Sequence, residues 1–110
     1  MARASQRKGR AGELELCRIL SGFGYDVKPG AAVSFGTTPD IVGLPGIHIE
    51  VKRRENTDIA AALKQASEDA QRFDDGLPAV FTRGNRQRWR VVMALDDFIS
   101  LYRRAENDRG

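Results

Sequence analysis

The sequence predicts an α/β fold in which helices flank a mixed central sheet, in the order helix, three strands, helix, two strands, helix. Apolar residues recur at helical spacing in two long segments, residues 8–21 and 59–73. Short apolar runs bounded by glycine and proline between and after these segments indicate strands. The 110 residues, 41% hydrophobic and 30% charged, are one domain's worth, so we expect a single domain over residues 1–110.

The N-terminal part predicts a helix, a strand and a loop. Apolar residues of segment 8–21 share one helical face, and Gly22 ends the pattern. A short strand is expected at residues 25–28. The following stretch, 29–38, contains Gly, Ala and Ser and is typical of a loop.

The C-terminal part predicts a helix, two strands and a last helix. Asn56 or Thr57 is placed to cap the helix over residues 59–73, and Gly76 to close it. The remaining strands and the last helix, capped by Asp96, are expected at residues 78–82, 89–93 and 96–104.

Between the two long helices, strands 40–43 and 47–53 form a hairpin. The connection Leu44-Pro45-Gly46 has glycine where a left-handed conformation is usually needed. Pairs whose numbers sum to ninety face each other, so Asp40 lies opposite Glu50. Like charges at about 5 Å destabilise a hairpin unless they are neutralised, and two carboxylates with backbone and water oxygens suit Mg²⁺ or Mn²⁺.

Strand alternation sets Glu50 and Lys52 on one face of the second hairpin strand. A metal ligand beside a fixed ammonium is what phosphodiester hydrolysis requires. A surface hairpin with a charged strand end is the alternative interpretation. His48 shares the strand face of Glu50, although a lone histidine on a strand is more often packed or at the surface.

Glu13 lies on the apolar face of the first helix, in step with Leu16, Cys17 and Leu20. Such an acid is unusual on an apolar face, and one interpretation is that it turns toward the hairpin and completes a metal shell or positions a water. A surface ion pair with Arg10 is the alternative.

Eighteen Lys and Arg against fifteen Asp and Glu give a net charge of +3, which is compatible with a polyanionic partner. Basic residues gather at residues 3–10, 52–54 and 83–90, where they would track a phosphate backbone if they share a face. Cys17 is the only cysteine, which excludes an intrachain disulfide and a cysteine-based zinc site. The polar start predicts an intracellular (cytoplasmic) protein with no membrane segment.

These residues resemble the PD-(D/E)xK nuclease superfamily, and within it the Holliday-junction-resolvase-like group of archaea and phages. Members begin with Lys-Gly before a helical Glu, here Lys8-Gly9 before Glu13. They continue with an Asp on the first hairpin strand and an Ile-Glu-Val-Lys strand, here Asp40 and residues 49–52. The resemblance extends through residues 89–91 and so covers most of the chain.

The resemblance implies a restriction-endonuclease-like core and a Mg²⁺ ion, replaceable by Mn²⁺, bound by Asp40, Glu50 and the Val51 carbonyl. Lys52 would orient the attacking water or the phosphate, and Glu13 would assist. DNA would be contacted by basic residues and one helix glutamine: Lys8, Arg10, Arg53, Arg54 and Gln65.

Members act as homodimers on branched DNA, in recombination and repair. The longer loop at residues 29–38 and the additional last helix look more like phage and prophage members, which leaves the substrate open. The alternatives are a nuclease with a different DNA substrate, restriction-like or single-strand cutting, and a DNA-binding relative without catalysis.

Overall fold

The computed structural model describes residues 2–32 and 38–109, with side chains from residue 10 onward. The α/β class and the order of elements agree with the expectation from sequence. The elements are α1 (Ala2–Gly22), β1 (Lys28–Pro29), the 3-10 turn η1 (Gly30–Ala32), β2 (Ile41–Val42), β3 (Ile47–Arg53), α2 (Ile59–Phe73), β4 (Leu77–Arg83), β5 (Arg90–Val92) and α3 (Leu95–Asp108).

The five strands form one mixed sheet in the spatial order β1-β2-β3-β4-β5. Strands β3 and β4 run parallel, and the other neighbours are antiparallel. Residues 79–82 of β4 are all buried, as expected for a central strand covered on both faces. In the β2–β3 hairpin Ile41 pairs with Ile49, which is the predicted register.

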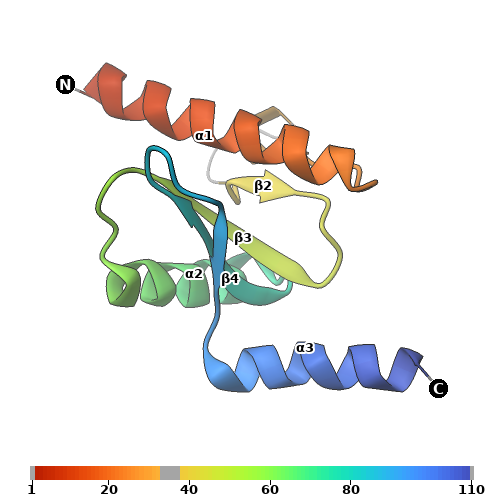
Figure 1. Cartoon of the computed structure of the whole chain (residues 1–110). Coiled ribbons are helices and arrows are strands. Elements are labelled where there is room, and N and C mark those ends of the chain that lie inside the picture. Colours follow the sequence, from red (N-terminus) through yellow and green to blue (C-terminus); the bar gives the residue numbers. More distant parts are fainter. Residues whose placement is uncertain (1, 33–37, 110) are drawn as a thin grey trace.

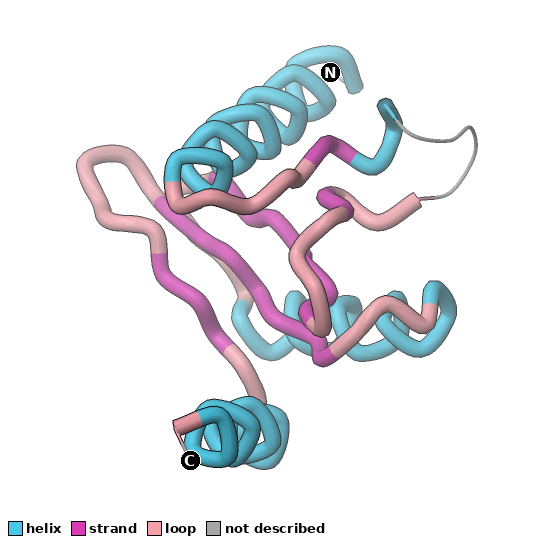
Figure 2. Tube along the Cα trace, turned by 90° about the vertical axis from the view of Figure 1, so that its right-hand side faces the viewer, coloured by secondary structure: helices cyan, strands magenta, loops and turns pink. Residues whose placement is uncertain are grey.

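Helices α1 and α2 cover opposite faces of the sheet (Figures 1 and 2). The larger cluster of buried residues includes Leu16 and Cys17 of α1 with Ile49 and Phe81 of the sheet. On the other face, small residues of α2 pack on Val80, and because they are alanines the helix backbone approaches the sheet closely. Side chains of β3 therefore point alternately toward α1 and α2.

Helix α3 stands apart from this layered core at the end of β5 (Figure 1), and none of its residues is buried. With α3 extending from it, the molecule measures 50 × 28 × 28 Å. Among the described residues, no helix combines the length and the apolar character needed to cross a membrane.

The first half departs from the expectation at three places. Helix α1 begins at Ala2 rather than residue 8, and β1 lies at Lys28–Pro29 rather than residues 25–28 because only these residues pair with β2. The predicted loop contains η1, whose Gly30 packs so closely on the Pro39 carbonyl that a side chain would clash. The rest of that loop, residues 33–37, is outside the described residues.

The predicted helix caps were wrong in detail. Asp58, rather than Asn56 or Thr57, caps α2 by accepting a hydrogen bond from the Ala61 amide at 3.1 Å. Helix α2 ends with Asp74 in the left-handed conformation, two residues before Gly76.

The last helix begins at Leu95, with Ala94 in the cap position and no side-chain cap. Asp96, the expected cap, lies in the first turn, where its charge still favours the helix N-terminus. The helix also runs on to Asp108 rather than ending at residue 104.

Candidate metal centre

The side chains of His48, Glu50 and Lys52 lie on the α2 face of β3, because alternate residues of a strand share a face. Glu50 is only 4% exposed, and the Lys52 Nζ lies 3.4 Å from its Oε2. The carboxylate and the ammonium thus lie side by side, as strand alternation predicts. Buried charges of this kind persist in folded proteins when they are paired or bind a metal.

Asp40 lies directly before β2, and the Ile41–Ile49 register sets it across from Glu50. Its Oδ2 accepts a hydrogen bond from the Val51 amide at 2.8 Å. This bond joins the first hairpin strand to the second beside Glu50 and fixes the orientation of the Asp40 carboxylate.

The electrostatic environment of Glu50 favours its neutral form. Burial is the main cause, and the nearby Asp40 carboxylate adds to it, so that the pKa of Glu50 rises from 4.5 to about 7 despite the opposing charge of Lys52. A divalent cation would neutralise these two acids, and their oxygen donors fit a hard ion such as Mg²⁺.

Glu13 approaches the same site from α1. It is half-buried, and burial followed by the Asp40 charge raises its pKa from 4.5 to about 7, while Arg10 opposes the shift. The interaction with Asp40 agrees with the expectation that Glu13 turns toward the hairpin. Arg10 is exposed, and the roles of Glu13 as a residue of the metal site or as an ion-pair partner of Arg10 both stay predictions.

The Lys52 ammonium is held from α2 as well, because its Nζ donates to the Gln65 Oε1 at 3.2 Å. Gln65 is exposed and adjoins the Glu50–Lys52 pair from the helix side. Lys8 lies within α1, but its side chain is outside the described part of the chain.

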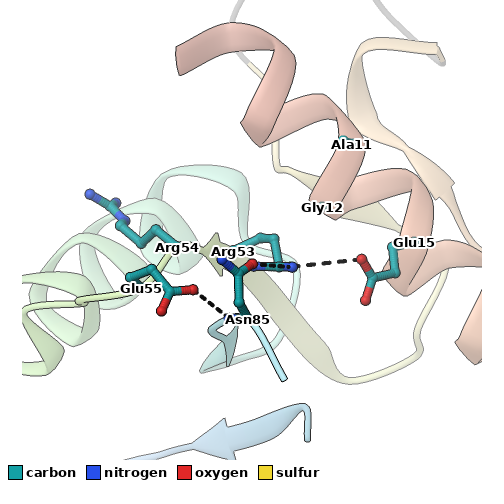
Figure 3. A pocket seen from close by; sticks show the side chains of 7 residues that line it. All are labelled: Ala11, Gly12, Glu15, Arg53, Arg54, Glu55 and Asn85. Carbon is teal, nitrogen blue, oxygen red and sulfur yellow. Dashed lines mark hydrogen bonds and ion pairs between the residues drawn. The ribbon is translucent and has the colours of Figure 1, made fainter. Parts of the chain in front are cut away.

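The neighbours Arg53 and Arg54 project in different directions. Figure 3 shows Arg53 reaching toward α1, where its guanidinium lies 3.7 Å from Glu15 and donates to the Asn85 Oδ1 at 3.0 Å, while Arg54 points away. They line a hollow between α1, the end of β3 and the β4–β5 turn. Arg54 is exposed, whereas Arg53 also helps to hold α1 on the sheet.

His48 is a member of the site that the sequence did not assign. It is 1% exposed, and its Nδ1 is 2.8 Å from the Asp75 Oδ1. Its Nε2 lies 4.0 Å from the Glu50 Oε1 and has no hydrogen-bond partner among the described residues. Ligand atoms of His48, Glu50 and Asp69 lie within 4.8 Å of one another.

Asp69 was also missed, although the sequence carries a signal for it. Gln65, Asp69 and Phe73 recur every four residues and therefore share the face of α2 that meets β3. The Phe73 ring stacks on His48 with centroids 6.4 Å apart.

Comparisons with known proteins bear on the fold. No protein-family model matches the chain, and no curated protein matches it. Among solved structures, the chain is similar to Archaeoglobus fulgidus Hjc, a Holliday junction resolvase from an archaeal hyperthermophile. Identity is 28%, over 74% of this chain and 72% of that one, with a TM-score of 0.53. This likeness confirms the restriction-endonuclease-like fold and supports the suspected superfamily.

Proposed function

We propose that the chain is a single nuclease domain, a metal-dependent endodeoxyribonuclease that hydrolyses phosphodiester bonds in Holliday junctions or other branched DNA. The observation that carries the proposal is the arrangement of Asp40 across from Glu50, with Lys52 paired to Glu50. The similarity to a Holliday junction resolvase supports the choice of substrate.

Asp40 and Glu50, with the Val51 carbonyl, would hold Mg²⁺, and Mn²⁺ would substitute for it. The raised pKa of the buried Glu50 beside Asp40 supports this set, since a cation would relieve the repulsion. A bound ion supplies Lewis-acid stabilisation of the phosphate and lowers the pKa of water.

The chain's own groups would provide positioning and charge. Lys52, held between Glu50 and Gln65, supplies a fixed positive charge where negative charge develops on the phosphate. Glu13, with a pKa of about 7, can take up or release a proton near neutral pH and so assist the attacking water.

DNA would be bound mainly through phosphates, which makes this part of recognition independent of sequence. Arg10 and Arg54 are exposed and would contact phosphates. Arg53 would have to exchange Glu15 or Asn85 for a phosphate. Lys8 and Gln65 complete the proposed set. A DNA substrate implies an intracellular location, and α3 is the feature that favours a phage or prophage origin.

We also infer that the protein acts as a homodimer, because cutting two opposed strands of a junction needs two active sites. Exposed apolar side chains gather on β5 and α3, namely Val91, Leu95, Phe98, Leu101 and Tyr102. Such a surface is typical of a subunit interface.

Cleavage of labelled DNA tests the activity and its substrate. Four-way junctions, flaps and linear duplexes are incubated with Mg²⁺ or with EDTA, and we expect metal-dependent cutting of the branched forms. Equal cutting of linear duplex would favour a restriction-like enzyme. Binding without any cutting would favour a non-catalytic relative.

Asp40→Asn tests the site. We expect DNA binding close to that of the wild type and a loss of cleavage on the order of 100-fold or more, because the amide removes the charge that holds the ion. Asp26→Asn, a change at an exposed carboxylate between α1 and β1, is the matched control and should cleave normally. Cleavage retained by Asp40→Asn would mean that the metal site is assigned to the wrong residues.

A further inference from the structure

A group of potential metal ligands lies on the α2 side of β3, next to the proposed catalytic pair. It consists of His48 and Glu50 from β3 and Asp69 from α2, with ligand atoms within 4.8 Å of one another. His48 and Glu50 are buried, and the Asp69 side chain is 23% exposed, which leaves a path from solvent.

The orientation of the His48 ring is the strongest sign of a ligand. Asp75 accepts from Nδ1, with its two oxygens 2.8 and 2.9 Å away, so in the neutral ring Nε2 carries a lone pair. This Nε2 is buried, faces the Glu50 Oε1 at 4.0 Å and lacks a hydrogen-bond partner within the described part of the chain. A buried polar atom without a partner destabilises the folded state unless something satisfies it. A carboxylate on the far nitrogen is the usual support of a metal-binding histidine.

We propose that His48 Nε2, Glu50 and Asp69 bind a divalent transition metal ion, with Asp75 as the residue that orients the imidazole. Two ligand atoms at about 2.1 Å from one ion lie at most about 4.2 Å apart, which the His48–Glu50 distance of 4.0 Å satisfies. Asp69 closes the remaining gap by rotating its partly exposed side chain. Two carboxylates neutralise the charge of the ion.

The donor set distinguishes this site from the one assigned to Asp40. Imidazole with carboxylates suits Zn²⁺, Co²⁺ and similar ions, whereas Mg²⁺ prefers oxygen alone. Glu50 adjoins both sites, since its Oε1 faces His48 and its Oε2 faces Lys52. The inference goes beyond the proposed function and does not depend on it, because binding needs neither DNA nor cleavage.

The alternative explanation is that ion pairs, without any metal ion, satisfy the acids of this group. Arg72 lies 3.3 Å from the Asp69 Oδ1, and Lys52 pairs with Glu50, so both acids have a cation at hand. Those contacts still leave His48 Nε2 without a hydrogen-bond partner in residues 10–32 and 38–109. The Asp69–Arg72 pair is an exposed contact between neighbours on one helix, which contributes little to stability. The metal-free account predicts that the histidine ring does not respond to metal ions.

His48 is the only histidine in the chain, so its ring nitrogens can be observed without ambiguity by ¹⁵N NMR. Zn²⁺ is titrated into metal-free protein without DNA, with Mg²⁺ in a parallel series. We expect a large, saturable shift of the Nε2 resonance at one equivalent of Zn²⁺, because the ion binds this nitrogen directly. With Mg²⁺ we expect a much smaller shift, because that ion acts on the nitrogen only through Glu50. Co²⁺ provides a second measurement, since its absorption spectrum reports coordination.

Two variants decide whether the ion occupies the proposed ligands. Asp69→Asn should weaken Zn²⁺ binding at least about tenfold, and its backbone NMR spectrum should remain that of a folded protein. Glu68→Gln, at the exposed neighbouring acid, should bind Zn²⁺ within about twofold of the wild type. An Nε2 resonance that ignores Zn²⁺, normal binding by Asp69→Asn, or a loss as large in Glu68→Gln would each overturn the proposal.

Discussion

At the scale of single residues, Glu13 and Glu50 make the stability of the folded protein depend on pH, because both acids bind a proton more tightly in the folded state than in the unfolded chain. Burial and the Asp40 carboxylate raise the pKa of both acids from 4.5 to about 7. Between these values the folded state holds more protons than the unfolded state, so the stability of the metal-free protein falls as pH rises. Above pH 7 both acids are charged and the destabilisation is complete.

Glu13→Gln should reduce this pH dependence, because the amide keeps the shape of the side chain and loses its charge. In EDTA, the wild type should melt at a lower temperature at pH 8 than at pH 5.5. The melting temperature of the variant should fall less between these two pH values. We expect the variant to melt about 4 °C above the wild type at pH 8, the shift that roughly 1 kcal/mol produces, since solvent screens part of the effect at a half-exposed group.

Thermal melts followed by circular dichroism provide the measurement. Because the other titrating groups are present in both proteins, their contribution to the pH dependence is removed when the two are compared. Glu68→Gln, at an exposed acid of α2, is the control and should follow the wild type. If the melting temperatures of Glu13→Gln and the wild type change equally over the whole pH range, Glu13 does not cause the pH dependence.

The arrangement of Asp40, Glu50 and Lys52 could be predicted because it is local. A hairpin with a short connection fixes its own register, and strand alternation then sets which side chains share a face. The proximity of His48 to Asp69 depends on how α2 packs across β3, which the spacing within either element does not determine. Spacing within the hairpin was therefore enough to bring its own side chains of the candidate site together, whereas the proximity of His48 to Asp69 was missed.

At the scale of elements, α1 packs tightly against β3 at Gly12. A Cβ atom built there would be 2.5 Å from the Cβ of Arg53 and 3.1 Å from its Cγ. Arg53 is itself held by Glu15 and Asn85, so it has little freedom to move aside. Glycine at this position lets the helix that carries Glu13 approach the hairpin.

Gly12→Ala should therefore destabilise the protein although alanine favours a helix by about 1 kcal/mol. Overpacking costs about 1–3 kcal/mol, and the methyl group of alanine cannot avoid Arg53 unless the backbone shifts. We therefore expect the free energy of unfolding in urea to fall by about 1 kcal/mol. Gly22→Ala, at the end of the same helix, is the control and should be neutral or stabilising, because a Cβ at that position would meet no atom within 4 Å. A Gly12→Ala protein as stable as the wild type would show that α1 can shift on the sheet.

Elements with a clear helical or strand periodicity were predicted well, whereas the short strand at the edge of the sheet and the helix caps were not. Strand β3 has the predicted bounds, and α2 spans the predicted residues, because alternation and helical spacing are properties of these segments themselves. Strand β1 is only two residues long and exists through its pairing with β2, so its position depends on a neighbour. The cap of α2 shifted to Asp58 because Thr57 faces Thr82 of β4 instead.

At the scale of the whole molecule, α3 buries none of its residues against the rest of the chain. It has 14 residues, none buried, and helices of this length are marginal in water without packing. Its Leu95 is 75% exposed, and the rings of Phe98 and Tyr102 stack on each other beside it. A second subunit covering this face would supply the missing packing and bring two active sites to one junction.

Leu95→Ser combined with Phe98→Ser should convert a dimer into a folded monomer, because it removes the two largest exposed apolar side chains at the start of α3. Sedimentation velocity at micromolar concentration measures the change, and circular dichroism checks the fold. Phe23→Ser, at a side chain 76% exposed beyond the end of α1, is the matched control and should remain dimeric. In junction cleavage, the monomer should nick one strand and release linear products slowly, since the second cut needs a second subunit. A wild-type monomer, or a dimer that survives the double change, would exclude α3 as the interface.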